Sequence, residues 1–278
     1  MAEITAEAVK ALRERTNLPM MECKKALMEA DGDQEKAIKI LKERVKGLQV
    51  KVADRVTSEG RVATMSSADG LSAVMVEVRC ESAPVAKGDD LLFLCDQLCK
   101  QLLNGPGAAS PDELLSQPCP DKPGMTLREL HEEALNKIRE NIVVARVLKV
   151  AGPVASYTHH DGSLGVLVQA TGTNATAPVL RDVAMQVAAL NPGVCLPEQL
   201  DPTTVAAARA KETEEAKKSG KPDNIIEKIV DGKMRLFYSN EGVLIAQPFV
   251  KDDKKTVEQA LAASGLTALG FTRWRLGQ

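Results

Sequence analysis

Aromatic residues are scarce in this 278-residue chain, where four phenylalanines, two tyrosines and one tryptophan make up 3% of the composition. Proteins that bind single-stranded nucleic acid stack the bases on aromatic side chains, so this class is disfavoured. A basic excess is missing too, because 36 lysines and arginines face 38 aspartates and glutamates, for a net charge of −2. Binding to nucleic-acid phosphates normally needs a clear positive excess. We therefore expect no direct nucleic-acid partner.

Long apolar runs are also missing, since none approaches the ~20 residues that span a bilayer. The first ten residues alternate charged and apolar types in a helical pattern, which is not the pattern of a secretion signal. The six cysteines form no C-x-x-C pair, and unpaired thiols of this kind are typical of reducing compartments. We expect a cytoplasmic protein with no membrane partner.

Common catalytic and phosphate-binding sequence motifs are absent as well. The chain has neither of the glycine-rich phosphate loops, no nucleophile elbow and no H-E-x-x-H. Cys95 and Cys99 lie one helical turn apart, but on a leucine-rich face, and structural zinc needs four ligands, so both are interpreted as core residues. His159 and His160 are adjacent, so their side chains would leave a strand on opposite faces and could not share a metal. We expect a surface turn there, no enzyme and no cofactor.

The chain is long enough for about two domains of ~150 residues, and its first part is helical in pattern. Breaks at Asn17–Pro19 and Asp31–Asp33 separate three segments of helical periodicity. Lys46–Arg55 is a charged stretch that we interpret as a linker. The sequence therefore predicts a small three-helix domain with its linker over residues 1–54.

After this domain the apolar period changes from that of a helix to that of a strand. A strand, an Asp-Gly turn, a second strand and a helix then occur twice in this order. The segments of the two copies are residues 60–66, 71–78 and 89–103, and residues 154–158, 164–169 and 179–190. This weak duplication predicts an α+β fold with two related core subdomains, residues 55–142 and 143–278. Further elements are predicted as a strand over 243–250, a helix over 256–263 and a strand over 269–276.

A polar insertion interrupts the second core subdomain at about residues 198–240. Two helical segments rich in alanine, glutamate and lysine are joined by the turn Ser219–Pro222, which predicts an antiparallel helical hairpin. Its low apolar content indicates a hairpin that protrudes and needs a partner to bury its thin seam. Pairing of two copies of the chain through this hairpin is one interpretation, and simple protrusion is the other.

The segment Leu12–Leu27 closely resembles the N-terminal signature of bacterial elongation factor Ts, including the methionine pair, the cysteine and the double lysine in register. The resemblance extends over essentially the whole chain. Other matching segments are Glu29–Asp33, Ser156–His159, Leu164–Val168, Ser219–Pro222 and Gln247–Val250.

The resemblance implies a guanine-nucleotide exchange factor of elongation factor Tu, with a ubiquitin-associated-like three-helix N-domain and a hairpin used in dimer contacts. It implies that Arg13, Met20 and Met21 touch a helix of the GTPase domain, and that His159 contacts its nucleotide-binding region. The residue pattern alone favours a different interpretation, with one methionine in the bundle core and Arg13 on a solvated face.

One segment departs from the family pattern. Ser82, Ala83, Pro84 and Val85 stand where the family has threonine, aspartate, phenylalanine and valine, and the family's phenylalanine wedges into the GTPase near its magnesium ion. The resemblance therefore implies a magnesium-dislocation loop at 82–85 without its usual wedge. The alternative hypotheses are a Tu-binding or chaperone-like module without strong exchange activity, and a thiol enzyme that uses Cys80 or Cys23.

Overall fold

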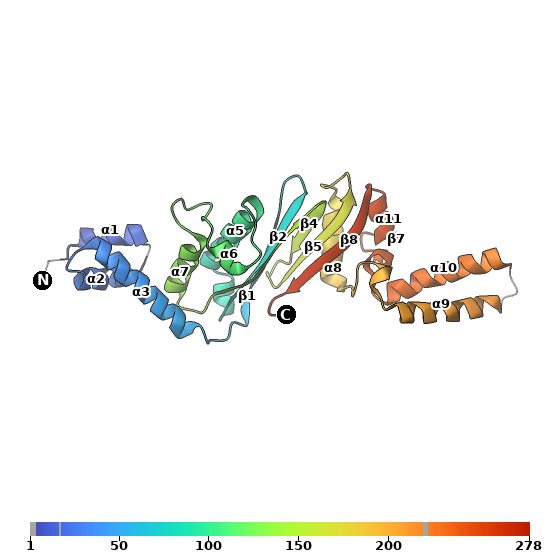
Figure 1. Cartoon of the computed structure of the whole chain (residues 1–278), viewed down its shortest axis with the longest axis horizontal. Coiled ribbons are helices and arrows are strands. Elements are labelled where there is room, and N and C mark those ends of the chain that lie inside the picture. Colours follow the sequence, from blue (N-terminus) through green and yellow to red (C-terminus); the bar gives the residue numbers. More distant parts are fainter. Residues whose placement is uncertain (1–3, 17, 219–221) are drawn as a thin grey trace. The chain divides into compact units, whose positions relative to one another are not determined.

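The computed structural model describes residues 4–16, 18–218 and 222–278. The chain forms two compact units, of which the first holds the residues up to 63, residues 76–148 and residues 276–278, and the second holds residues 64–75 and 149–275. Helices alternate with small antiparallel sheets (Figure 1), which confirms the predicted α+β class. Asn17 and residues 219–221, on which two predicted turns depend, lie outside the described residues.

Three helices begin the first unit: α1 (Ala6–Thr16), α2 (Met20–Glu29) and α3 (Gln34–Val52). Two of their starts are capped by side chains: Thr5 accepts a bond from the Ala8 amide, and Asp33 accepts bonds from the Glu35 and Lys36 amides. The bundle closes around one buried apolar cluster, formed by Val9, Leu12, Leu18, Cys23, Ala26, Leu27, Ala30, Ala37 and Leu41.

The predicted linker Lys46–Arg55 is helical over most of its length, because α3 continues to Val52. The stretch contains no proline, and its lysines, leucine and glutamine favour a helix. Val52 is fully buried, so a tertiary contact stabilises the last turn of α3. Charge alone was therefore a poor indicator of a linker here.

The middle of the chain combines three strands, each with residues in both units, with four helices of the first unit. Strands β1 (Glu59–Ser66), β2 (Ser72–Cys80) and β3 (Val143–Ala151) form a sheet in the order β1-β2-β3. The helices are α4 (Ala83–Ala86), α5 (Asp89–Asn104), α6 (Pro111–Leu115) and α7 (Leu127–Ile138). The predicted core role of Cys95 and Cys99 is confirmed: both are buried on α5, and burial raises the pKa of the Cys95 thiol to about 12.

The second unit is built on a sheet of β4 (Val154–Thr158), β5 (Leu164–Gly172) and β8 (Leu266–Arg275), all antiparallel, in the order β4-β5-β8. Helix α8 (Pro178–Leu190) packs against this sheet through Leu180, Val183, Ala184 and Val187. The short helix α11 (Val257–Ala262) adds Val257, Ala260 and Leu261 to the same core.

The prediction of one strand over residues 243–250 is wrong. The segment contains a 3-10 turn, η2 (Leu244–Ala246), and the two-residue strand β6 (Pro248–Phe249). The amide of Gln186 on α8 donates to the Pro248 carbonyl, and the Val250 amide donates to the Gln186 side-chain oxygen. A buried glutamine side chain thus takes the place of a neighbouring strand, which the local sequence does not reveal.

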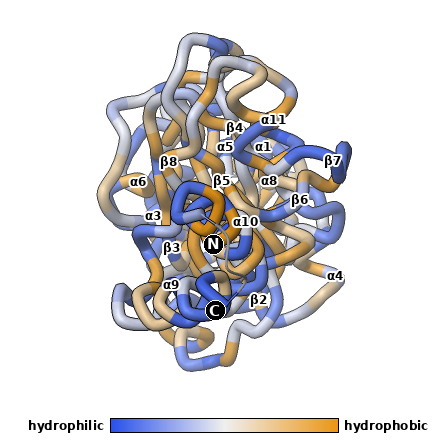
Figure 2. Tube along the Cα trace, turned by 90° about the vertical axis from the view of Figure 1, so that its right-hand side faces the viewer, coloured by the Kyte–Doolittle hydropathy of each residue, from blue (hydrophilic) through white to orange (hydrophobic). Residues whose placement is uncertain are grey.

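Among the described residues, strand β6 pairs with β7 (Asp252–Thr256) alone. The sequence of β7 is Asp-Asp-Lys-Lys-Thr, and it is the blue, hydrophilic strand of Figure 2. Charged side chains on an edge strand discourage another chain from adding to the sheet. This small sheet is therefore protected against edge-to-edge pairing.

Helices α9 (Pro202–Lys217) and α10 (Asp223–Asn240) run side by side in opposite directions (Figure 1). Their seam is thin and consists of buried Ala216, Ile226, Val230 and Met234. Arg209 and Asp231 form an ion pair of 2.8 Å across it. Among the described residues, none of the helices combines the length and the apolar character that a membrane span requires.

Acid is expected to destabilise the first unit through His131, which is buried on α7 with its Nε2 atom 2.7 Å from the Ile142 carbonyl. Burial lowers the pKa of His131 below its usual value. The neutral ring is therefore favoured in the folded state, so its stability contribution is present above about pH 6.5 and is lost as the pH falls. Urea unfolding between pH 8 and 5.5 should show this loss, at most about 1.4 kcal/mol per pH unit.

The variant His131→Gln, which keeps a donor but does not titrate, is the control for this prediction. Its unfolding free energy should lose most of the pH dependence in that interval. Carboxylates with lowered pKa values, such as Asp161, act in a separate interval below about pH 4. A wild-type free energy of unfolding that stays constant from pH 8 to 5.5 would contradict the prediction.

Candidate functional site

The two methionines of the resembling segment are both exposed at the start of α2. Met20 is 51% exposed and Met21 is 62% exposed, whereas Cys23, Ala26 and Leu27 form the buried face of the helix. The interpretation that one methionine fills the bundle core is therefore wrong. Leu18, which precedes the helix, is buried in the core cluster.

Arg13 is exposed on α1, as its solvated-face interpretation predicted. It lies one residue after buried Leu12, so the bundle core fixes the backbone that carries it. Adjacent large apolar side chains that are exposed to solvent are typical of a surface that binds another protein. Arg13, Met20 and Met21 are thus exposed and do not belong to the buried core of the bundle.

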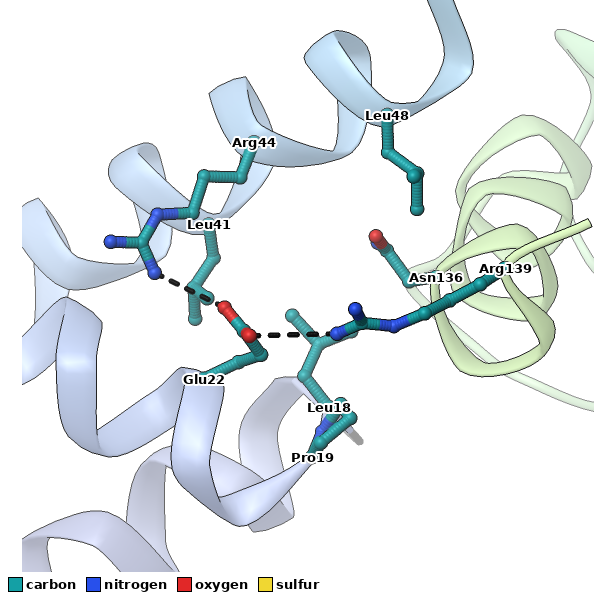
Figure 3. Close-up of a pocket in the computed structure, with 8 residues that line it drawn as sticks. All are labelled: Leu18, Pro19, Glu22, Leu41, Arg44, Leu48, Asn136 and Arg139. Carbon is teal, nitrogen blue, oxygen red and sulfur yellow. Dashed lines mark hydrogen bonds and ion pairs between the residues drawn. The ribbon is translucent and has the colours of Figure 1, made fainter. Parts of the chain in front are cut away.

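Glu22, in the first turn of α2, ties this helix to two others (Figure 3). Its carboxylate forms ion pairs with Arg44 on α3, at 3.2 Å, and with Arg139 at the C-terminal end of α7, at 3.5 Å. These groups border a cavity of about 160 Å³. The start of α2 is therefore connected by charge to the end of α7.

The 82–85 segment is a helical turn and not the loop that was expected. Ala83 begins the short helix α4, and Pro84 occupies its first turn, where the fixed φ of proline suits a helix and its missing amide donor costs nothing. Ala83 and Pro84 are exposed, while Ser82 and Val85 are half-buried. The segment therefore presents a rigid, weakly polar tip to solvent.

Glu140 holds the base of this turn. Its carboxylate accepts hydrogen bonds from the Ser82 hydroxyl at 2.6 Å, the Ser82 amide at 3.0 Å and the Glu81 amide at 3.1 Å. In return the Glu81 carboxylate accepts a bond of 2.6 Å from the Asn141 amide. Sequence reasoning missed Glu140, because no motif marks a residue whose partners lie 58 and 59 positions away.

Residues 139–141 therefore connect two of the candidate features within the first unit. Arg139, in a left-handed conformation with φ of 63°, reaches Glu22 beside the methionine pair. Its neighbour Glu140 fixes Ser82 at the start of α4. The structure thus links the start of α2 to the 82–85 segment through one short junction.

His159, in the second unit, follows the last residue of β4. Its amide donates to the Leu164 carbonyl at 2.9 Å, and its Nδ1 atom lies 3.1 Å from the Tyr157 hydroxyl. The rings of His159 and His160 are 4.3 Å apart in an edge-to-face arrangement. The expectation that these side chains point to opposite faces is wrong, because β4 ends at Thr158 and strand alternation stops there. Among the described residues, no group of three metal-ligating side chains occurs.

The cysteines are interior residues of the fold. All six are free and buried. Burial raises the pKa of Cys80 and of Cys195 to about 11, whereas a nucleophilic thiol has a lowered pKa. This direction argues against Cys80 as the nucleophile of the thiol-enzyme hypothesis.

Comparison with known proteins is consistent along the whole chain. A sequence model of the family described as elongation factor TS matches residues 81–278. The elongation factor Ts of Thiobacillus denitrificans is 41% identical over all of this chain and 93% of its own length. That of Aromatoleum aromaticum is 38% identical over all of this chain and 92% of its own length. That of Hydrogenobaculum sp. is 40% identical over 99% of both chains.

Proposed function

This chain belongs to the elongation factor Ts family of translation elongation factors, and from this premise we propose that it is a guanine-nucleotide exchange factor for elongation factor Tu in the cytoplasm. It binds elongation factor Tu–GDP, disturbs the magnesium and phosphate site of that protein, and promotes GDP release so that GTP can be loaded. The exposure of Met20 and Met21 at the start of α2 is the observation that carries the proposal.

Exchange of this kind is a shift of populations and needs no chemical step. A factor that binds nucleotide-free GTPase more tightly than loaded GTPase must weaken nucleotide binding by the same ratio, because coupling between two ligands is reciprocal. A difference of about 4 kcal/mol weakens the nucleotide roughly a thousandfold. A protein that works in this way needs no acid, base or nucleophile and is not an enzyme in the chemical sense.

The candidate residues divide this work. Arg13, Met20 and Met21 anchor the partner, while α4 and His159 press on its nucleotide side. Phosphates are commonly held by a loop and a helix N-terminus, so a displacement of roughly an ångström removes charge-assisted bonds there. The three hydrogen bonds that the Glu140 carboxylate accepts make α4 stiff enough to transmit such a displacement.

Stopped-flow release of fluorescent GDP from elongation factor Tu tests the proposal. Release should accelerate with factor concentration and reach a plateau. Tight binding without acceleration would favour a Tu-binding or chaperone-like module. The replacement of the family's aspartate and phenylalanine by Ala83 and Pro84 supports this alternative. If the chain neither binds elongation factor Tu nor accelerates GDP release, both functions are refuted.

Replacing Pro84 by alanine is expected to slow exchange about threefold, because a stiff apolar tip is exchanged for a smaller and less constrained one. The exchange rate at saturating factor is the measurement. Pro202→Ala, which alters another exposed proline in the first turn of a helix, is the matched control. An unchanged rate for Pro84→Ala would mean that backbone contacts or other surfaces act in its place.

A second copy of the chain is the other partner that we propose. Ile225 and Leu236 are exposed on α10, beside the thin seam of the α9–α10 hairpin. Burying them against another hairpin would give a homodimer. Sedimentation equilibrium distinguishes it from a monomer.

A further inference from the structure

Two arginines lie at one end of the β4-β5-β8 sheet, on the face that packs against α8. Val166 of β5 pairs with Tyr157 on one side and Arg273 on the other, and Leu164 pairs with Arg275. Directly paired residues point to the same face of a sheet. Because Leu164 and Val166 belong to the core under α8, Arg273 and Arg275 continue this core-facing row to its end.

A pocket of about 300 Å³ opens where the row ends. Its apolar wall comes from Met185 and Ala188 of α8, and both arginines and His159 border it. All of these residues belong to the second unit. The pocket is therefore formed within one compact body and combines a short apolar wall with cationic groups.

Within the described part of the chain, one nitrogen of the half-buried Arg273 side chain lacks a hydrogen-bond partner. Its Nε atom is buried and has no hydrogen-bond partner among the described residues. Burial, followed by the repulsion of Arg275, lowers the pKa of Arg273. A buried charged donor without a partner is costly, and so are two cations side by side. A ligand with negative charge beside the Nε atom would relieve the cost of the missing partner.

The one carboxylate among the described residues that border the pocket, that of Asp161, does not supply the partner that the Arg273 Nε atom lacks. Asp161 lies on the rim, but its oxygen accepts bonds of 2.8 Å from the amide and the hydroxyl of Ser163. Within the part of the chain that the structure describes, the Nε atom of Arg273 has no bond to this carboxylate. A carboxylate from another molecule would supply the acceptor that the Arg273 Nε atom lacks.

We propose that this pocket receives an acidic side chain of the protein partner, whose carboxylate binds Arg273 and Arg275. The proposal rests on the proposed function, because elongation factor Tu is taken as that partner. A planar carboxylate matches the fork of a guanidinium. The methylene groups of an aspartate or glutamate fit the wall of Met185 and Ala188, which offers nothing to a phosphate. His159, assigned to the partner interface, stands on the same rim.

Equilibrium binding of nucleotide-free elongation factor Tu to wild type, Arg275→Gln and Arg273→Lys tests the proposal. Both variants should bind at least about tenfold more weakly, and Arg275→Gln should show a smaller dependence of affinity on salt. Arg181→Gln is the matched control, since Arg181 is an exposed arginine on α8 of the same unit. Because Arg275 is exposed, its variant keeps the fold and decides the question even where Arg273→Lys is destabilised.

The partner's carboxylate can be identified by charge exchange. Arg275→Glu should abolish tight binding, and one aspartate-to-lysine or glutamate-to-lysine variant of elongation factor Tu should restore it. Wild-type affinity of Arg275→Gln and of a folded Arg273→Lys would overturn the proposal while leaving the exchange function intact. The proposal would also be overturned if the factor alone binds inorganic phosphate or GDP and Arg275→Gln abolishes that binding. The pocket would then be a phosphate site. A wild-type chain that does not bind elongation factor Tu would overturn both.

Discussion

Replacing Met20 and Met21 together by alanine is expected to weaken binding to elongation factor Tu roughly a hundredfold while the three-helix bundle stays folded. Burying one methionine side chain contributes about 1.5–3 kcal/mol, so losing two such contacts costs about 3 kcal/mol or more. Both side chains are exposed in the free protein, so their removal opens no cavity. Titration calorimetry measures the affinity, and thermal unfolding checks the fold.

Met28→Ala is the matched control for this double variant. Met28 is on the same helix and is 54% exposed, but it lies at the opposite end, next to Glu29. Its substitution should leave the affinity within about twofold, because energetically neutral positions surround a few strong ones in most interfaces. Unchanged affinity of the Met20→Ala/Met21→Ala variant would remove the anchor role from the start of α2.

Replacing Glu140 by alanine is expected to lower the exchange rate at saturating factor about tenfold, with affinity reduced only about threefold. The Ser82 hydroxyl, the Ser82 amide and the Glu81 amide all donate to this carboxylate. Leaving such half-buried donors without their acceptor costs about 1–3 kcal/mol, and α4 loses its fixed position. Exchange then falls more than binding, because the bundle still anchors the partner.

Stopped-flow release of GDP and equilibrium binding, measured on the same preparation, separate these two effects. Glu258→Gln, a substitution of an exposed glutamate on α11, is the control for loss of one negative charge. If Glu140→Ala exchanges nucleotide at the wild-type rate, α4 is not the element that acts on the nucleotide side. If affinity and rate fall equally, Glu140 supports the whole first unit instead of positioning α4.

Elements with strong local signals could be predicted from the sequence. The leucine spacing over 89–103 corresponds to α5, and Thr126–Glu129 and Thr256–Gln259, which carry the local sequence pattern of a capping box, form one. At Ser110, the hydroxyl accepts from the Glu113 amide, but the Glu113 carboxylate binds the Ala109 amide instead of closing the box. Local patterns succeed where residues within four positions supply the partners.

The candidate site was less accessible from the residues themselves. Arg13, Met20, Met21 and His159 were selected by a family resemblance, and periodicity alone would have placed one methionine in the core. Pattern reasoning fails there because burial on a small helix depends on which neighbouring helix supplies the facing side chains. The strand expected over residues 243–250 failed for the same kind of reason, since Gln186 stands in for a neighbouring strand.

The amino-acid sequence by itself determined most of the helical and strand-forming segments with their caps and turns, because these properties depend on residues a few positions apart. Only the tertiary structure decided that both methionines are exposed to solvent, that Glu140 holds the 82–85 turn, and that half-buried Arg273 borders one pocket with Arg275 and His159. Each of these facts depends on which segments that are distant in the sequence come into contact, and packing of the whole core determines those contacts.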